Sequence, residues 1–108
     1  MASPEVIYIN SDNIVEVLGV ENVPTSEYLN NADVTLTLVD AASKVEIVGQ
    51  TWPLTLSYVT GSDGDYRGTI RNEAVLNPHQ QLIAQVTVDA GEGLVRYWEK
   101  RCIAEIGD

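Results

Sequence analysis

Residues 33–40, with the sequence DVTLTLVD, carry the pattern that decides the fold of this chain. Val34 and two leucines alternate with two threonines, and a period of two places the aliphatic side chains on one face of a β-strand. The same alternation recurs in Leu54–Val59 and in Leu82–Val88. Each of these stretches is therefore predicted to be a strand with one buried face.

Weaker strand patterns fill much of the remaining chain. Short runs rich in Val, Ile, Thr and Tyr are separated by clusters of Gly, Asn, Asp and Pro, which is typical of strands joined by turns. Leu94–Ile106 exceeds the usual strand length, and we expect a bulge or break near Glu99–Arg101, where its alternation slips. The charged run Lys44–Val48 reads as a short edge strand. The other expected strands are Val6–Ile9, Ile14–Leu18 and Tyr66–Ile70.

The loops between these runs are also recognisable. Residues 61–65, GSDGD, are predicted to form a hairpin loop in which Gly64 supplies a positive φ. Residues 89–93, DAGEG, are expected to join the last two strands in the same way. Glu21–Asn31 is the longest predicted loop, and Asn72–Leu76 has room for about one helical turn at most.

This spacing of strands and turns predicts an all-β fold. We expect an immunoglobulin-like β-sandwich of about 7–8 antiparallel strands, and a small barrel with similar patterning is the alternative architecture. The 108 residues fit a single domain over 1–108, with residues 1–12 as a candidate extended N-terminal arm. Because no disulfide is available, Trp52, Trp98 and the aliphatic faces are expected to fill the core.

The charge balance excludes two classes of partner. Sixteen acidic residues against 6 Lys and Arg give a net charge of -10, so neither nucleic-acid binding nor attraction to anionic membranes is expected. The lone Cys102 lies in an apolar run and is predicted to be a small core residue. Residues 1–13 lack the basic segment and long apolar stretch of a signal peptide, which favours synthesis as a soluble protein in the cytoplasm.

No catalytic or metal-binding constellation stands out in the sequence. His79 is the single histidine and is read as a solvated loop residue rather than a general base. Asp63 and Asp65 flank a glycine and could help to bind Ca²⁺, although turn chemistry alone also explains them. One cysteine and one histidine do not suffice for a zinc site. The expectation is a protein without cofactors and without enzymatic activity.

The segment that follows residue 95 is the most unusual surface feature. Arg96, Lys100 and Arg101 make up half of the six basic residues, within a chain that is acidic almost everywhere else. They are interpreted either as solvated strand positions or as an electrostatic contact with a partner subunit. Tyr97 and Trp98 are neighbours and must face opposite sides of a strand, so Trp98 is a candidate for the core, an interface or a ligand platform.

Two longer stretches together resemble a known family. NADVTLTLVDAASKVEIVGQTWPLTLSYVTGSDGDYRGTI and AVLNPHQQLIAQVTVDAGEGLVRYWEKRC resemble small immunoglobulin-like structural proteins of tailed bacteriophages, with a layout similar to the N-terminal domain family of phage baseplate upper proteins. Asp33–Asp40, Asp65–Gly68 and Ala84–Gly91 match its strand, hairpin and second strand. A glycine turn usual before the second strand is replaced here by His79-Gln80-Gln81. The resemblance covers roughly residues 30 to 105 and transfers no functional residue.

The resemblance implies a structural role in a virion. The expected function is assembly, as a subunit of the head-to-tail junction or neck, the tail or a decoration layer. The expected partners are other virion subunits, including copies of the same chain in a symmetric ring or lattice. A carbohydrate- or ligand-binding module that uses Trp98 or Trp52 as a stacking surface is the alternative, and a small hydrolase is a third hypothesis.

Overall fold

The computed structural model describes residues 5–22, 25, 27–91 and 95–107. Strands and loops make up these residues, with no helix among them, so the predicted all-β class is confirmed. None of the described residues forms a helix that is long and apolar enough to cross a membrane. The strands are β1 (Glu5–Tyr8), β2 (Asn13–Val17), β3 (Glu21–Asn22), β4 (Glu27–Tyr28), β5 (Asp33–Asp40), β6 (Leu54–Tyr58), β7 (Tyr66–Ile70), β8 (Gln81–Asp89) and β9 (Val95–Glu105).

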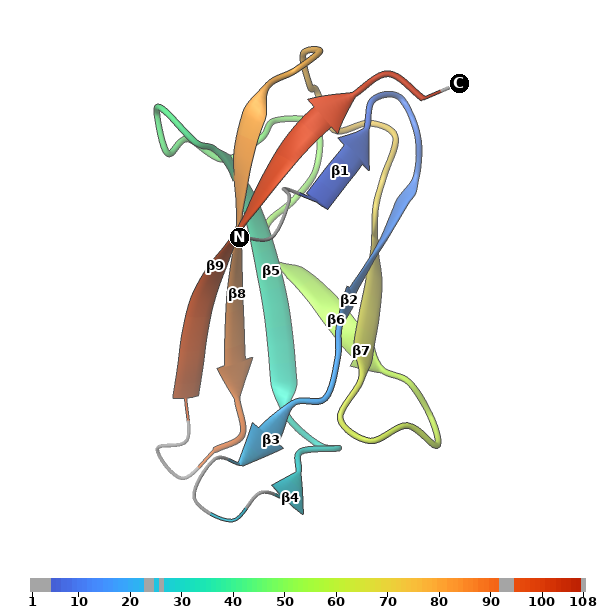
Figure 1. Cartoon of the computed structure of the whole chain (residues 1–108), viewed down its shortest axis with the longest axis vertical. Coiled ribbons are helices and arrows are strands. Elements are labelled where there is room, and N and C mark those ends of the chain that lie inside the picture. Colours follow the sequence, from blue (N-terminus) through green and yellow to red (C-terminus); the bar gives the residue numbers. More distant parts are fainter. Residues whose placement is uncertain (1–4, 23–24, 26, 92–94, 108) are drawn as a thin grey trace.

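Seven of the strands form one mixed sheet in the order β1-β9-β8-β5-β6-β7-β2, while β3 and β4 pair separately (Figure 1). β1 runs parallel to β9 and every other neighbouring pair is antiparallel, so the expectation of antiparallel strands throughout was wrong at this pair. β1 and β2 are the two ends of the sheet, yet only residues 9–12 separate them in the chain. The sheet therefore bends round until its ends meet, and its shape is nearly that of a barrel.

The core lies inside this curved sheet, and β5 and β8 contribute most of it. The two strands are paired along their whole length, and their alternate residues are buried. Burying one such aliphatic side chain contributes about 1.5–3 kcal/mol. The alternation predicted from the sequence is thus confirmed for both strands, whose buried inward residues are Val34, Leu36, Leu38, Leu82, Ala84, Val86 and Val88.

β9 is one continuous strand. It pairs with β8 from Gln81 opposite Ile103 to Asp89 opposite Val95 without a slip in register. The predicted bulge or break near Glu99–Arg101 was therefore wrong, and Leu94 lies outside the described residues. The alternation of apolar and polar residues slips there because β1 pairs only with the residues from Cys102 onward, while the backbone of β9 stays regular.

Lys44–Val48 is not a strand, which corrects a second expectation. Only Glu46 pairs, in an isolated bridge with Val39. Asp40 explains the difference, since its carboxylate accepts hydrogen bonds from the backbone N–H groups of the two residues that follow Ala41. A turn results, and Lys44 leaves it with a φ of 62° that no strand can contain.

The loop predicted over Glu21–Asn31 contains β3 and β4, and its residues 23–24 and 26 lie outside the described part of the chain. The buried Tyr66 fastens it, donating a hydrogen bond from its hydroxyl to the carbonyl of Leu29 (2.6 Å) and accepting one from the N–H of Ala32 (3.0 Å). Gly64 has the predicted positive φ of 74°, and a Cβ there would lie 2.5 Å from the carbonyl oxygen of Val20.

Other expectations concern the ends and the connections. Residues 5–8 of the candidate N-terminal arm are β1 and belong to the sheet, while residues 1–4 lie outside the described residues. Asn72–Leu76 contains a turn and no helix. Of the predicted loop 89–93, Gly91 has a positive φ of 81°, and residues 92–93 lie outside the described residues.

Candidate functional site

The two halves of β9 differ in what lies on the side away from β8. β1 pairs only with Cys102 to Glu105. No described strand pairs with residues 95–101 on that side, although β8 continues along the other side as far as Val95. We call residues 95–101 the open edge of β9.

Backbone polar groups point out from the open edge. The N–H and C=O of Ala104 bond towards the β8 side, to Gln80 and His79, whereas the carbonyl of Glu105 bonds to Ile9 on the β1 side. Because these directions alternate along an antiparallel strand, the odd-numbered residues of the open edge present their backbone groups away from β8. These residues are Val95, Tyr97, Glu99 and Arg101.

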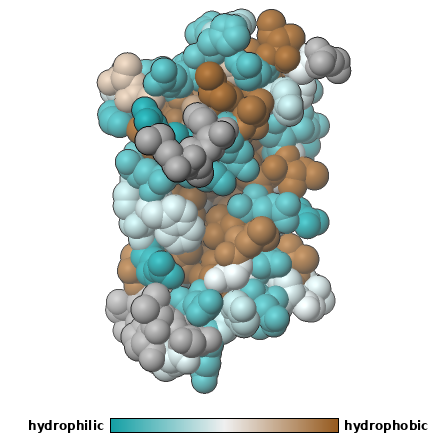
Figure 2. Space-filling model, in the orientation of Figure 1, coloured by the Kyte–Doolittle hydropathy of each residue, from teal (hydrophilic) through white to brown (hydrophobic). Residues whose placement is uncertain are grey.

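A groove runs along the inner face of the open edge. The even-numbered residues Arg96, Trp98 and Lys100 share this face with the buried Cys102 and Ala104. The groove has a volume of about 290 Å³. Its floor is apolar, because inward side chains of the core reach its base. Figure 2 shows hydrophobic surface between β9 and β2 in the lower middle of the molecule. Its lining includes Glu5, Glu16, Val17, Leu36, Val86, Trp98 and Lys100.

Charged side chains stand along the rim of the groove. Nζ of Lys100 lies 3.3 Å from Oε2 of Glu5, and Glu16 on β2 pairs with Arg67 at 3.1 Å. The guanidinium of Arg96 lies 5.7 Å from the ring centroid of Trp98. Within the described part of the chain, no carboxylate pairs with Arg96. Its neighbour in the described structure is therefore the ring of Trp98.

The structure divides the predicted basic patch between two faces. Arg101 lies with Tyr97 and Glu99 on the outer face, while Arg96 and Lys100 lie on the inner face, where Lys100 lines the groove. The hydroxyl of Tyr97 donates a hydrogen bond to Oε2 of Glu99 at 2.7 Å, and this bond raises the pKa of Tyr97 above its ordinary value. Tyr97 is 56% exposed, whereas Trp98 is half-buried against the core.

Asn13 links β1 to β2 through its side chain, and the sequence reasoning missed this role. Its side-chain amide accepts a hydrogen bond from the N–H of Tyr8 (2.8 Å) and donates one to the carbonyl of the same residue (2.9 Å). The amide therefore behaves as one more peptide unit that joins β1 to β2. Asn13 is buried, yet the sequence run NSDN before β2 signals only a turn.

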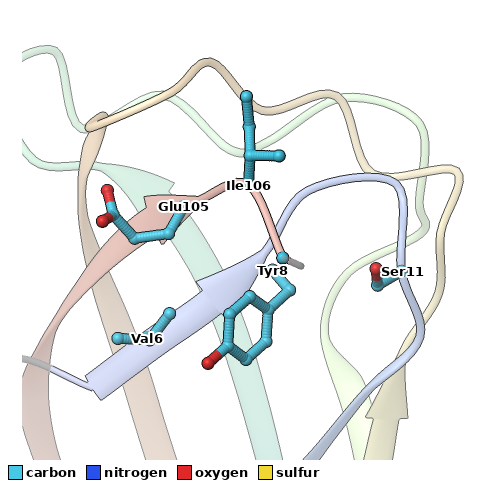
Figure 3. A pocket seen from close by; sticks show the side chains of 6 residues that line it. Val6, Tyr8, Ser11, Glu105 and Ile106 are labelled. Atoms are coloured by element: carbon cyan, nitrogen blue, oxygen red, sulfur yellow. The ribbon is translucent and has the colours of Figure 1, made fainter.

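A second, wide hollow of about 610 Å³ lies at the upper end beside β1 (Figure 3). Val6 and Tyr8 form part of its wall, and Ile106 projects from its rim. Figure 3 shows the carboxylate of Glu105 turned away from Tyr8 and Ser11, so the polar groups do not converge on one point. Glu105 is instead bound by Nδ1 of His79 at 2.7 Å.

The other residues considered for catalysis or metal binding lie in exposed loops or in the core. His79 is an exposed loop residue, as predicted, and its backbone has a positive φ of 64°. Cys102 is 3% exposed in the core, and burial raises the pKa of its thiol to about 11. The carboxylate of Asp65 accepts a hydrogen bond from the N–H of Gly19 (2.9 Å). Asp63 is exposed, and no group of three or more metal-ligating side chains occurs among the described residues.

Comparison with known proteins adds no further assignment. No protein-family model, curated protein or solved structure matches this chain.

Proposed function

We propose that this chain is a non-enzymatic structural subunit of a tailed-bacteriophage virion that acts by binding neighbouring subunits. The observation that supports a binding role most directly is the open edge of β9. Unpaired backbone groups on an exposed strand are a template for another strand, and folded proteins usually cover or blunt such an edge. The bacteriophage assignment rests on the sequence resemblance over roughly residues 30 to 105.

In this proposal the fold is a variant of the immunoglobulin-like sandwich. The strands β1, β9, β8 and β5 would form one layer, and β7 and β2 the other, with β6 at the bend between them. The common core of the two halves supports this description. In the virion, the chain would stand at the neck, in the tail or in a decoration layer, where repeated contacts form a ring or lattice.

The carbohydrate-binding alternative has less support from the geometry. A stacking platform needs a free aromatic face, whereas Trp98 packs against the core and carries the guanidinium of Arg96 near its ring. Trp52 is also half-buried, and its indole N–H donates to the carbonyl of Ile47 at 2.7 Å.

Mass spectrometry of purified particles of the encoding phage tests the proposal. We expect the chain in stoichiometric amounts, and its absence from the particles would contradict the virion assignment. A matched pair of variants tests the role of the edge. Glu99→Pro removes an outward N–H without touching the ladder to β8, while Glu99→Ala removes only the side chain. Incorporation should fail for the proline variant and persist for the alanine variant.

A further inference from the structure

Strand β1 is a separable part of the sheet. β1 and β2 lie at opposite ends of the strand order, so the pairings from β9 round to β2 do not involve β1. Within the described residues, β1 pairs with one strand, β9, along its 4 residues. Residues 9–12, which we call the hinge, connect β1 to β2. A change in the hinge alone would therefore release β1 and leave every other strand pairing in place.

The contacts that hold β1 do not require it to belong to the same chain. Ile7 is buried in the core, and the side chain of Asn13 binds the N–H and C=O of Tyr8. Oε2 of Glu5 lies 3.3 Å from Nζ of Lys100. All of these partners lie outside the hinge, so β1 of a second copy would make the same contacts. Exchange of an identical element between copies is a low-cost route to association for this reason.

The closed hinge contains a turn that an L-residue adopts at a cost. Asn10 has a φ of 55°, in the left-handed region that favours glycine. The hinge is also short, because it reverses the chain within residues 9–12. Short connections under strain favour the exchange of the element that they attach, since the turn disappears when the connection extends. Extended, these residues span about 13 Å, which is enough to reach an adjoining copy.

An extended hinge also gives β1 the direction that a second copy needs. In the closed form, β1 points towards the upper end of the molecule and β2 points away from it (Figure 1). With the hinge extended, β1 would lie beyond the upper end and run in the same direction as β2. On a copy turned upside down, that direction is the one in which β1 normally runs. A two-fold arrangement with the upper ends facing therefore lets each copy receive β1 of the other.

We propose that two copies of this chain exchange β1 by extending the hinge and associate with their upper ends facing each other. The inference deepens the proposed function by naming the neighbouring subunit. It rests on that function only in placing the contact inside a particle. Each copy then supplies Ile7 to the core of the other, so neither core is complete without its partner.

The surface beside the hinge supports this contact. Ser11 of the hinge lines the wide hollow at the upper end together with Tyr8 and Ile106, both of which are exposed (Figure 3). A second copy facing this end would cover these apolar side chains. The lower end is acidic, and the facing arrangement keeps the two acidic ends far apart. The carboxylates of β3, β4, the neighbouring loop and the strand ends there are Glu21, Glu27, Asp33, Asp63, Asp65 and Asp89.

A disulfide between copies tests the exchange. Glu5 is paired with Cys102, and adjacent strands lie about 4.8 Å apart, within the reach of a disulfide. The double variant Glu5→Cys/Cys102→Ala has a thiol on β1 and none on β9. It is refolded together with the natural chain labelled with ¹⁵N, and oxidised glutathione is added after refolding. We expect a disulfide between the two chains, which mass spectrometry recognises because one chain is labelled and the other is not.

Two controls make the result specific. Ser57→Cys/Cys102→Ala places an exposed thiol on β6 and should form no disulfide with the natural chain, because Cys102 is buried. Glu5→Cys in a chain that keeps Cys102, refolded at high dilution, should form the disulfide within one chain and so verify the register. Absence of the mixed disulfide would overturn the inference. An equal yield from the Ser57→Cys variant would overturn it as well.

The hinge itself provides a matched pair of variants. Asn10→Gly accepts the positive φ without cost and should lower the yield of exchanged copies. Asn10→Pro fixes φ near -65° and cannot form the closed turn, so it should raise the yield. We expect yields of the mixed disulfide that differ by about tenfold or more between backgrounds carrying these two substitutions in both chains. Equal yields would contradict the role of the hinge.

The two proposals fail in distinguishable ways. If no mixed disulfide forms but the chain is present in purified particles, only the exchange of β1 is lost. If the mixed disulfide forms as expected but the chain is absent from the particles, the exchange stands and the virion assignment is lost.

Discussion

The two halves of β9 share a register with β8 but differ in their second neighbour and in the burial of their inward side chains. In the upper half, where β1 pairs with β9, Cys102 and Ala104 are 3% and 0% exposed. In the lower half, the corresponding inward positions hold Arg96, Trp98 and Lys100. The comparison shows that the inward side chains of β9 match their burial. Small apolar residues lie where β1 pairs with the strand, and charged or aromatic residues lie where it does not.

The largest effect should come from placing a charge on the inner face at each end of β9. Ala104→Asp puts a carboxylate in the closed half, where it is cut off from water, and should lower the free energy of unfolding by about 3 kcal/mol or more. Lys100→Asp makes the same residue in the open half, on the same face, and should change it by less than about 1 kcal/mol. Urea denaturation measures both, and similar losses would remove the contrast between the halves.

The next effect concerns the closure of the sheet at its upper end. Asn13→Ala leaves the N–H and C=O of Tyr8 without their side-chain partners, which should cost about 1–3 kcal/mol. Asn72→Ala removes an exposed amide from a loop and should be nearly neutral. Thermal denaturation compares the two variants, and an Asn13→Ala protein as stable as Asn72→Ala would show that this amide does not hold the ends of the sheet together.

The contrast also predicts different thiol reactivity along the inner face. Burial raises the pKa of Cys102 from 9.0 to about 11, which lowers its thiolate fraction at pH 8 by about 100-fold. A thiol introduced by Lys100→Cys, in a Cys102→Ala background, lies at the open rim of the groove. It should react with a disulfide reagent at least 100-fold faster, a factor of about that size following from the thiolate fraction alone. Comparable rates at the two positions would mean that the upper half of β9 is not covered.

Part of this contrast could be predicted from the sequence. The period of two in Asp33–Asp40 and Leu82–Val88 predicted the central strands correctly, because both face one core along their whole length. Gly64 was also predicted correctly, since a positive φ in such a loop favours glycine. These features are local, so neighbouring residues suffice to reveal them.

The rest depends on contacts between distant parts of the chain. The slip near Glu99–Arg101 was interpreted as a broken backbone, whereas it marks the place where the cover of β1 ends. The parallel pairing of β1 with β9 joins the two ends of the chain, and no periodicity encodes it. Asn13 closes the sheet through its side chain, which a composition typical of turns does not reveal.

The smallest effect is a pH dependence at the closed end of the sheet. The side chain of Gln80 donates a hydrogen bond to Asp40, which, with bonds from Ser43, lowers the pKa of Asp40 below its ordinary value of 3.8. A lowered pKa stabilises the fold above pH 3.8, and this stabilisation is lost as the pH falls through the lowered value. Gln80→Ala should raise the pKa of Asp40. The measurement follows the nuclear magnetic resonance signal of its carboxyl carbon as the pH is varied. An unchanged midpoint would contradict this assignment.

The central claim is that the described strands pair with β9 on both sides above and on one side below, and amide hydrogen exchange tests it most directly. In the isolated chain, the amides of Ile103 and Glu105 should be protected by β1, and those of Trp98 and Lys100 by β8. The amides of Tyr97, Glu99 and Arg101 should exchange at nearly the rate of an unpaired backbone. Protection of these three as strong as that of Ile103 would contradict the open edge.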